Sequence, residues 1–109
     1  MKLFIKDRIY IPQLLLPQNN FLDFTIKKGI IEKVMLTEAD RTKYSIVEDS
    51  EAGKVTWDNQ VDFDNPLEVE FSPQELDYLK RSCEALSASV YPDDLWMTVE
   101  KIYNTINEQ

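Results

Sequence analysis

Histidine is absent from this sequence of 109 residues, and glycine and cysteine are scarce, with two residues and one. Without histidine there is no Ser-His or Cys-His nucleophilic pair, no imidazole general base and no mixed cysteine and histidine zinc site. The two glycines, Gly29 and Gly53, are too few for a glycine-rich phosphate loop. We therefore expect a protein that is not an enzyme and that uses no cofactor and no metal.

Long apolar runs and cysteine pairs are also lacking. No stretch approaches the roughly 18 apolar residues that a membrane span requires, and the first residues lack the pattern of a secretory signal. The single Cys83 excludes an internal disulfide, and its place in an apolar helical pattern predicts a buried small side chain. These features predict a cytoplasmic location and no membrane partner.

Basic residues are outnumbered: twelve Lys and Arg stand against twenty Asp and Glu, for a formal net charge of −8. Residues 1–44 carry eight basic and five acidic residues, a balance of +3, whereas residues 45–109 carry four and fifteen, a balance of −11. This net charge repels a nucleic-acid backbone, so direct nucleic-acid binding is not expected. The acidic part is either a solvated face or a docking face for a basic partner.

The length is that of one domain, and 43% hydrophobic residues are enough for one core, so we expect residues 1–109 to form a single domain. Residues 6–16 are dense in apolar side chains and predict a short helix that starts just before Pro12 or kinks there. Residues 21–36 fit a hairpin at first, but their four-residue apolar spacing continues over sixteen positions and favours a helix. Thr37 resembles the N-cap of a short helical turn.

Three strands are expected in the middle of the chain. Residues 45–47 and 54–58 flank a polar connection that ends at Gly53, a pattern typical of a β-hairpin with Val55 and Trp57 on one face. Residues 58–66 read as an acidic loop. Residues 67–71 then alternate apolar and acidic side chains as a half-buried strand does.

Two helices are expected at the end of the chain. Ser72, Pro73 and Glu75 form a capping box with proline at the first helical position, and an apolar stripe follows. A second amphipathic helix follows Pro92. The predicted fold is α+β, with two N-terminal and two C-terminal helices packed around a three-stranded, mainly antiparallel sheet. The predicted core is Leu14, Leu15, Ile30, Val34, Val55, Trp57, Val69, Phe71, Leu76, Leu79, Cys83, Leu86, Trp96, Val99, Ile102 and Tyr103.

The acidic loop is the first candidate site, because oxygen-bearing side chains alternate along it as they do in calcium loops. Phe63 and Val69 stand where an EF-hand needs glycine and glutamate, so a calcium site is not expected. The loop and the following strand supply the candidate interaction residues for a protein partner. They are Asp58, Asp62, Asp64, Glu68 and Glu70.

Aromatic and basic side chains leave two alternatives open. Trp57 and Trp96 are either core residues or anchors for a partner, since tryptophan is frequent at binding hot spots. A basic group either contacts phosphates or forms a solvated helix face. It consists of Lys27, Lys28, Lys33, Arg41 and Lys43.

Several segments taken in order resemble a known pattern: LLPQNNF, the next helix, LTEAD, GKVTW, EVEFSPQELDYLK and the last helix. The chain is similar to a group of small uncharacterised proteins encoded in bacteriophages, prophages and bacterial genomes. The resemblance implies an α+β arrangement and an origin in a mobile element, and it implies no catalytic residue.

These observations lead to one functional expectation and one alternative. We expect a small acidic interaction or structural accessory module that binds a protein partner or itself, and we infer no small-molecule substrate. The alternative is a nucleic-acid-linked accessory protein or a DNA mimic, whose carboxylates imitate phosphates. An enzyme ranks third, because no pair of carboxylates and no serine with a lysine is placed together by the pattern.

Overall fold

The computed structural model describes residues 1–107, which contain six helices and four short strands. The predicted α+β class is confirmed. In chain order the elements are β1 (Lys2–Leu3), α1 (Ile5–Leu14), α2 (Phe21–Val34), α3 (Glu38–Lys43), β2 (Val47–Asp49), β3 (Lys54–Thr56), α4 (Asn59–Asp64), β4 (Leu67–Glu68), α5 (Pro73–Leu86) and α6 (Asp93–Asn107).

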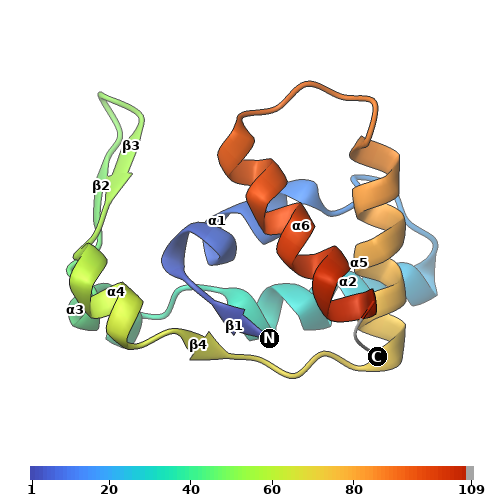
Figure 1. Ribbon diagram of the computed structural model, residues 1–109, viewed down its shortest axis with the longest axis horizontal. Coiled ribbons are helices and arrows are strands. Elements are labelled where there is room, and N and C mark those ends of the chain that lie inside the picture. Colours follow the sequence, from blue (N-terminus) through green and yellow to red (C-terminus); the bar gives the residue numbers. More distant parts are fainter. Residues whose placement is uncertain (108–109) are drawn as a thin grey trace.

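The four longest helices, α1, α2, α5 and α6, pack against one another and form the body of the molecule (Figure 1). The core lies between them. Eleven of the sixteen predicted core residues are buried, and Leu86, Trp96 and Tyr103 are partly buried against the core. Six large buried side chains were not in the predicted core, namely Leu3, Ile5, Ile11, Tyr44, Tyr78 and Leu95.

The prediction of one three-stranded sheet is wrong, because the strands form two separate antiparallel pairs. β2 pairs with β3, whereas β4 pairs with β1, with Leu3 opposite Leu67. The side chains of the hairpin strands are exposed, so the hairpin has no apolar face to lay against the third strand. Leu3 is buried, and this apolar residue draws the N-terminal strand to β4 instead.

The hairpin of β2 and β3 extends away from the helical body (Figure 1). Gly53 has a φ of 64°, the left-handed conformation that glycine adopts without a steric penalty. Val55 is 37% exposed and Trp57 is half-buried outside the core cluster, so the prediction of these two residues as core is wrong. The predicted hairpin is confirmed by the antiparallel pairing of β2 with β3, but its face with Val55 and Trp57 is not packed into the core.

α2 confirms the helical interpretation of residues 21–36. The side chain of Asn20 accepts a hydrogen bond from the backbone N–H of Asp23 at 2.8 Å and caps the first turn. At the other end, the buried Arg8 guanidinium donates to the backbone carbonyls of Val34 and Met35 at 3.0 and 2.8 Å. A cation on the last carbonyls of a helix satisfies acceptors that have no partner within the helix.

α1 starts at Ile5 and contains Pro12, so of the two predicted alternatives the start just before the proline is wrong. The start is set by Asp7, which accepts a hydrogen bond from the backbone N–H of Phe4 at 3.0 Å. Asp7 is 2% exposed, and it also accepts hydrogen bonds from Thr98 and Lys101 of α6. These contacts hold α1 against α6. Their stabilisation compensates for the backbone hydrogen bond that α1 loses at Pro12.

The prediction of a loop over residues 58–66 is wrong for most of this segment, because it contains the short helix α4. Asp58 is its N-cap and accepts from the backbone N–H groups of Gln60 and Val61. The capping box of α5 is confirmed, since Ser72 accepts from the N–H of Glu75 and Glu75 accepts from the N–H of Ser72.

Candidate functional site

The five predicted interaction residues lie on α4, β4 and the segments beside them, but they do not form one exposed row. Asp64, Glu68 and Glu70 are exposed, and Asp64 accepts two hydrogen bonds from the amide of Gln60. Asp58 is exposed, and one of its oxygens is used to cap α4. Four of the five carboxylates are therefore within reach of a partner.

Asp62 is the exception, because its side chain points into the protein. It is 7% exposed and accepts a hydrogen bond from the backbone N–H of Ile5 at 2.9 Å. Burial raises the pKa of its carboxyl above the usual value of 3.8. This side chain joins α4 to the start of α1 and is not available to a partner.

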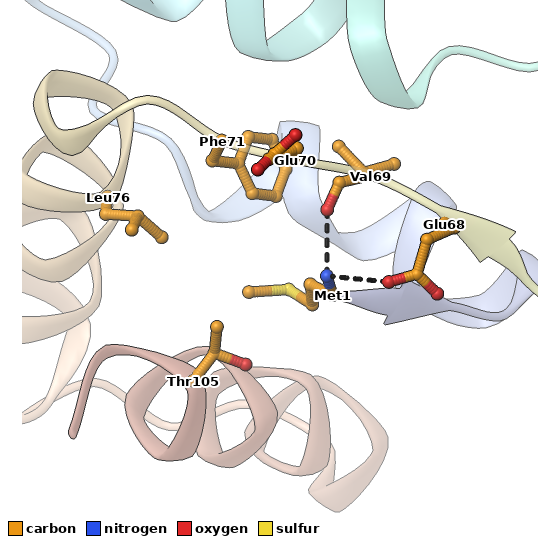
Figure 2. A pocket seen from close by; sticks show the side chains of 7 residues that line it. All are labelled: Met1, Glu68, Val69, Glu70, Phe71, Leu76 and Thr105. Atoms are coloured by element: carbon orange, nitrogen blue, oxygen red, sulfur yellow. Dashed lines mark hydrogen bonds and ion pairs between the residues drawn. The ribbon is translucent and has the colours of Figure 1, made fainter. Parts of the chain in front are cut away.

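A cavity of about 490 Å³ lies beside Glu68 and Glu70 (Figure 2). The amino group of Met1 donates to the carbonyl of Val69 at 2.8 Å and lies 3.4 Å from the carboxylate of Glu68. Leu76 and Thr105 line the same space from α5 and α6 (Figure 2). Because the amino group offsets one carboxylate, this cavity does not concentrate negative charge.

A second surface was not anticipated from the sequence. Phe21, Leu22 and Phe24 of α2 are 83%, 68% and 53% exposed, and only Ile30 and Val34 of this helix are buried. In Figure 1 the first turn of α2 extends past α5. Phe21 and Phe24 lie together, whereas Leu22 lines a separate pocket with Pro73 and Arg81 of α5. Large exposed apolar side chains that lie together mark binding surfaces.

An open groove of about 830 Å³ runs beside these aromatic rings. Phe21, Phe24 and Ile31 form its apolar part, and the loop of residues 17–20 forms one end. Lys27 and Lys28 also line it, and the Lys27 ammonium donates to the carbonyl of Leu16 at 2.6 Å. Glu32 is the acidic residue of the groove. We call these residues together the α2 groove.

The structure divides the predicted basic group. Lys33 pairs with Glu75, Arg41 pairs with Glu48 at 2.9 Å, and the Lys43 ammonium lies 5.3 Å from the centre of the Tyr44 ring. Only Lys27 and Lys28 remain together, in the α2 groove. The group therefore does not form one surface for phosphates.

The two tryptophans are both half-buried. Trp96 packs against the core and meets Tyr91 edge to face, with ring centres 6.0 Å apart. Trp57 and Val55 line a small pocket with Lys6 and Tyr10. Neither indole is exposed enough to act as the main anchor for a partner.

Comparison with known proteins adds no relative, since no family model, no curated protein and no solved structure matches this sequence. Within residues 1–107, no group of three or more His, Cys, Asp or Glu side chains is placed to hold a metal ion. No helix in the same range is long and apolar enough to cross a membrane. The candidate sites therefore rest on the geometry of this chain alone.

Proposed function

We propose that this chain is a protein-binding module and that the α2 groove is its main docking surface. The observation that carries the proposal is that Phe21 and Phe24, which are 83% and 53% exposed, line the same groove. Covering one such side chain with a partner contributes about 1.5–3 kcal/mol. Aromatic side chains at the centre of an interface supply much of its binding energy.

The acidic surface of Asp58, Asp64, Glu68 and Glu70 is the second surface of the proposed module and suits a basic region of a partner. The DNA-mimic alternative has less support, because a mimic needs a continuous row of free carboxylates. Asp62 is buried inside this stretch and Asp58 caps α4. We place the module in the cytoplasm and, by the resemblance to small phage proteins, in a mobile element, which the neighbouring genes would test.

The test is a photo-crosslinking experiment that distinguishes the two surfaces. A benzophenone amino acid replaces Phe24 in the α2 groove, Phe63 on α4 beside the acidic surface, or Val55 on the hairpin, which serves as the control. All three side chains are exposed. Each variant is illuminated in cells of the source organism, and adducts are identified by mass.

We expect a defined protein adduct from position 24 that disappears when Phe21→Ser is added. An adduct from position 63 alone would assign docking to the acidic surface and overturn the role of the α2 groove. The same adducts from all three positions, or none, would contradict a protein-binding function at these sites.

A further inference from the structure

We infer that the α2 groove binds a short acidic segment of a protein partner, with apolar residues that cover Phe21 and Phe24. The inference rests on the proposed function, because it names the chemistry of the partner at the same surface. It is carried by three features of the groove: unpaired cations, an exposed aromatic pair and limited length.

The cations are the first feature. Seven of the twelve Lys and Arg side chains lie within 4.0 Å of a carboxylate; among the described residues Lys2, Lys27, Lys28, Lys43 and Lys54 do not. Two of these five, Lys27 and Lys28, line one groove. Lys27 uses one N–H for the carbonyl of Leu16, and an ammonium has three N–H donors. Both side chains are free to bind carboxylates.

The residues of the α2 groove carry a positive net charge. Glu32 offsets one of the two ammonium groups, so the groove residues carry a net charge of +1. Asp23, in the first turn of α2, accepts two hydrogen bonds of 3.0 Å from Arg81, which also pairs with Asp77, and these three residues line a different pocket. The first turn of the 14-residue α2 adds the partial positive charge of a helix N-terminus. The groove therefore attracts an anionic group.

The apolar pair is the second feature. Phe21 and Phe24 are three residues apart on α2, which places them on neighbouring parts of one helix face. Ile31 continues the apolar lining beyond the two lysines. A segment that carries carboxylates alone would leave these side chains in water, so the matching occupant also carries aromatic or aliphatic residues.

The length of the groove is the third feature. Its helical lining runs from Phe21 to Glu32, which corresponds to about 16 Å along the helix axis. An extended chain covers that distance with about five residues. The matching occupant is therefore a short segment rather than a whole domain face.

The net charge of −8 indicates which kind of protein carries the acidic segment. Two copies of this chain repel each other at long range, as does any strongly acidic protein. A partner that carries a local acidic segment on a less acidic body avoids this repulsion. The charges therefore favour a different protein over a second copy.

The test is selection of a phage-displayed library of random 12-residue peptides on the intact protein. Phage that also bind the double variant Phe21→Ser, Phe24→Ser are removed. We expect the remaining peptides to carry at least two Asp or Glu residues beside aromatic or aliphatic residues. Their affinity, measured by titration calorimetry, is expected to fall about tenfold in Lys27→Gln, Lys28→Gln and to fall with added salt.

The matched control is Lys43→Gln, Lys54→Gln, which removes two exposed lysines elsewhere and should leave the affinity unchanged. Neutral or basic peptides, no enrichment, or equal loss in both lysine variants would overturn the inference. Analytical ultracentrifugation that shows a dimer, lost in the double phenylalanine variant, would assign the groove to a second copy and also overturn it. In each of these cases an adduct from position 24 would leave the proposed function standing.

Discussion

The carboxylate of Asp62 accepts a hydrogen bond from the backbone N–H of Ile5, 57 positions earlier in the chain. The bond places a buried acid at the first residue of α1, where the N–H groups of the helix have no partner within it. Burial outweighs this bond and raises the pKa of Asp62. The interaction orients α1, but burial of the charged carboxylate lowers the free energy of unfolding.

This cost predicts a pH dependence for Asp62→Asn. The pKa of Asp62 is higher in the folded than in the unfolded chain, so the cost of the charged form is present at neutral pH and is relieved as pH falls through the folded pKa. The free energy of unfolding of the original protein should therefore rise relative to the variant between about pH 7 and pH 4. Urea titrations at several pH values measure the difference. Asp64→Asn, at an exposed position, is the control, and a constant difference for Asp62→Asn would contradict the assignment.

Arg8 is predicted to matter more for stability than any exposed ion pair. Arg8 is 4% exposed, and its guanidinium pairs with Asp40 at 2.7 Å and donates to the carbonyls of Val34 and Met35. Arg8→Met should lower the free energy of unfolding by about 3 kcal/mol, because it leaves buried acceptors and a carboxylate without their partner. Arg41→Met breaks the more exposed pair with Glu48 and should cost less than about 1 kcal/mol. Equal losses in urea denaturation would count against this role of Arg8.

The capping box predicts the effect of Ser72→Ala. The hydroxyl of Ser72 accepts from the N–H of Glu75 at 3.2 Å, so its loss leaves a donor at the start of α5 without a partner. The free energy of unfolding should fall by about 1 kcal/mol. Ser89→Ala, at an exposed serine after α5, should leave the denaturation midpoint unchanged. An unchanged midpoint for both variants would show that Ser72 does not stabilise the helix.

The double variant Phe21→Ser, Phe24→Ser is expected to fold as the original protein does. Both rings are more than half exposed, and substitutions at such positions usually change stability by less than about 0.5 kcal/mol. Phe71→Ser is the contrast, because that ring is 8% exposed and belongs to the core. Thermal unfolding followed by circular dichroism separates the two. A large loss in the double variant would mean that the rings stabilise the fold rather than a complex.

Helices with strong local signals could be predicted from the sequence. The capping box at Ser72 and the apolar stripes of α5 and α6 are properties of neighbouring residues, and the structure confirms these helices. The pairing of β1 with β4 could not be predicted, because Leu3 and Leu67 meet across most of the chain and neither two-residue strand has a periodic pattern. α4 was missed since its polar sequence resembles a loop.

The candidate surfaces also include parts that could be predicted from neighbouring residues and parts that depend on residues far away in the chain. The exposed carboxylates of α4 and β4 could be named from the sequence, but the burial of Asp62 depends on Ile5, far away in the chain. The α2 groove could not be found, because an apolar helix does not indicate which of its side chains a neighbour covers. All three of Phe21, Phe24 and Ile30 are apolar, but only Ile30 is buried by the elements that pack against α2.

The buried carboxylate of Asp7 also constrains the order in which the protein matures during synthesis. Its two side-chain partners, Thr98 and Lys101, follow it by 91 and 94 positions. A ribosome translates about 5–20 residues per second, so α1 waits several seconds for the helix that completes its first turn. The hydrogen bonds from Thr98 and Lys101 to Asp7 can therefore form only after α6 has been synthesised.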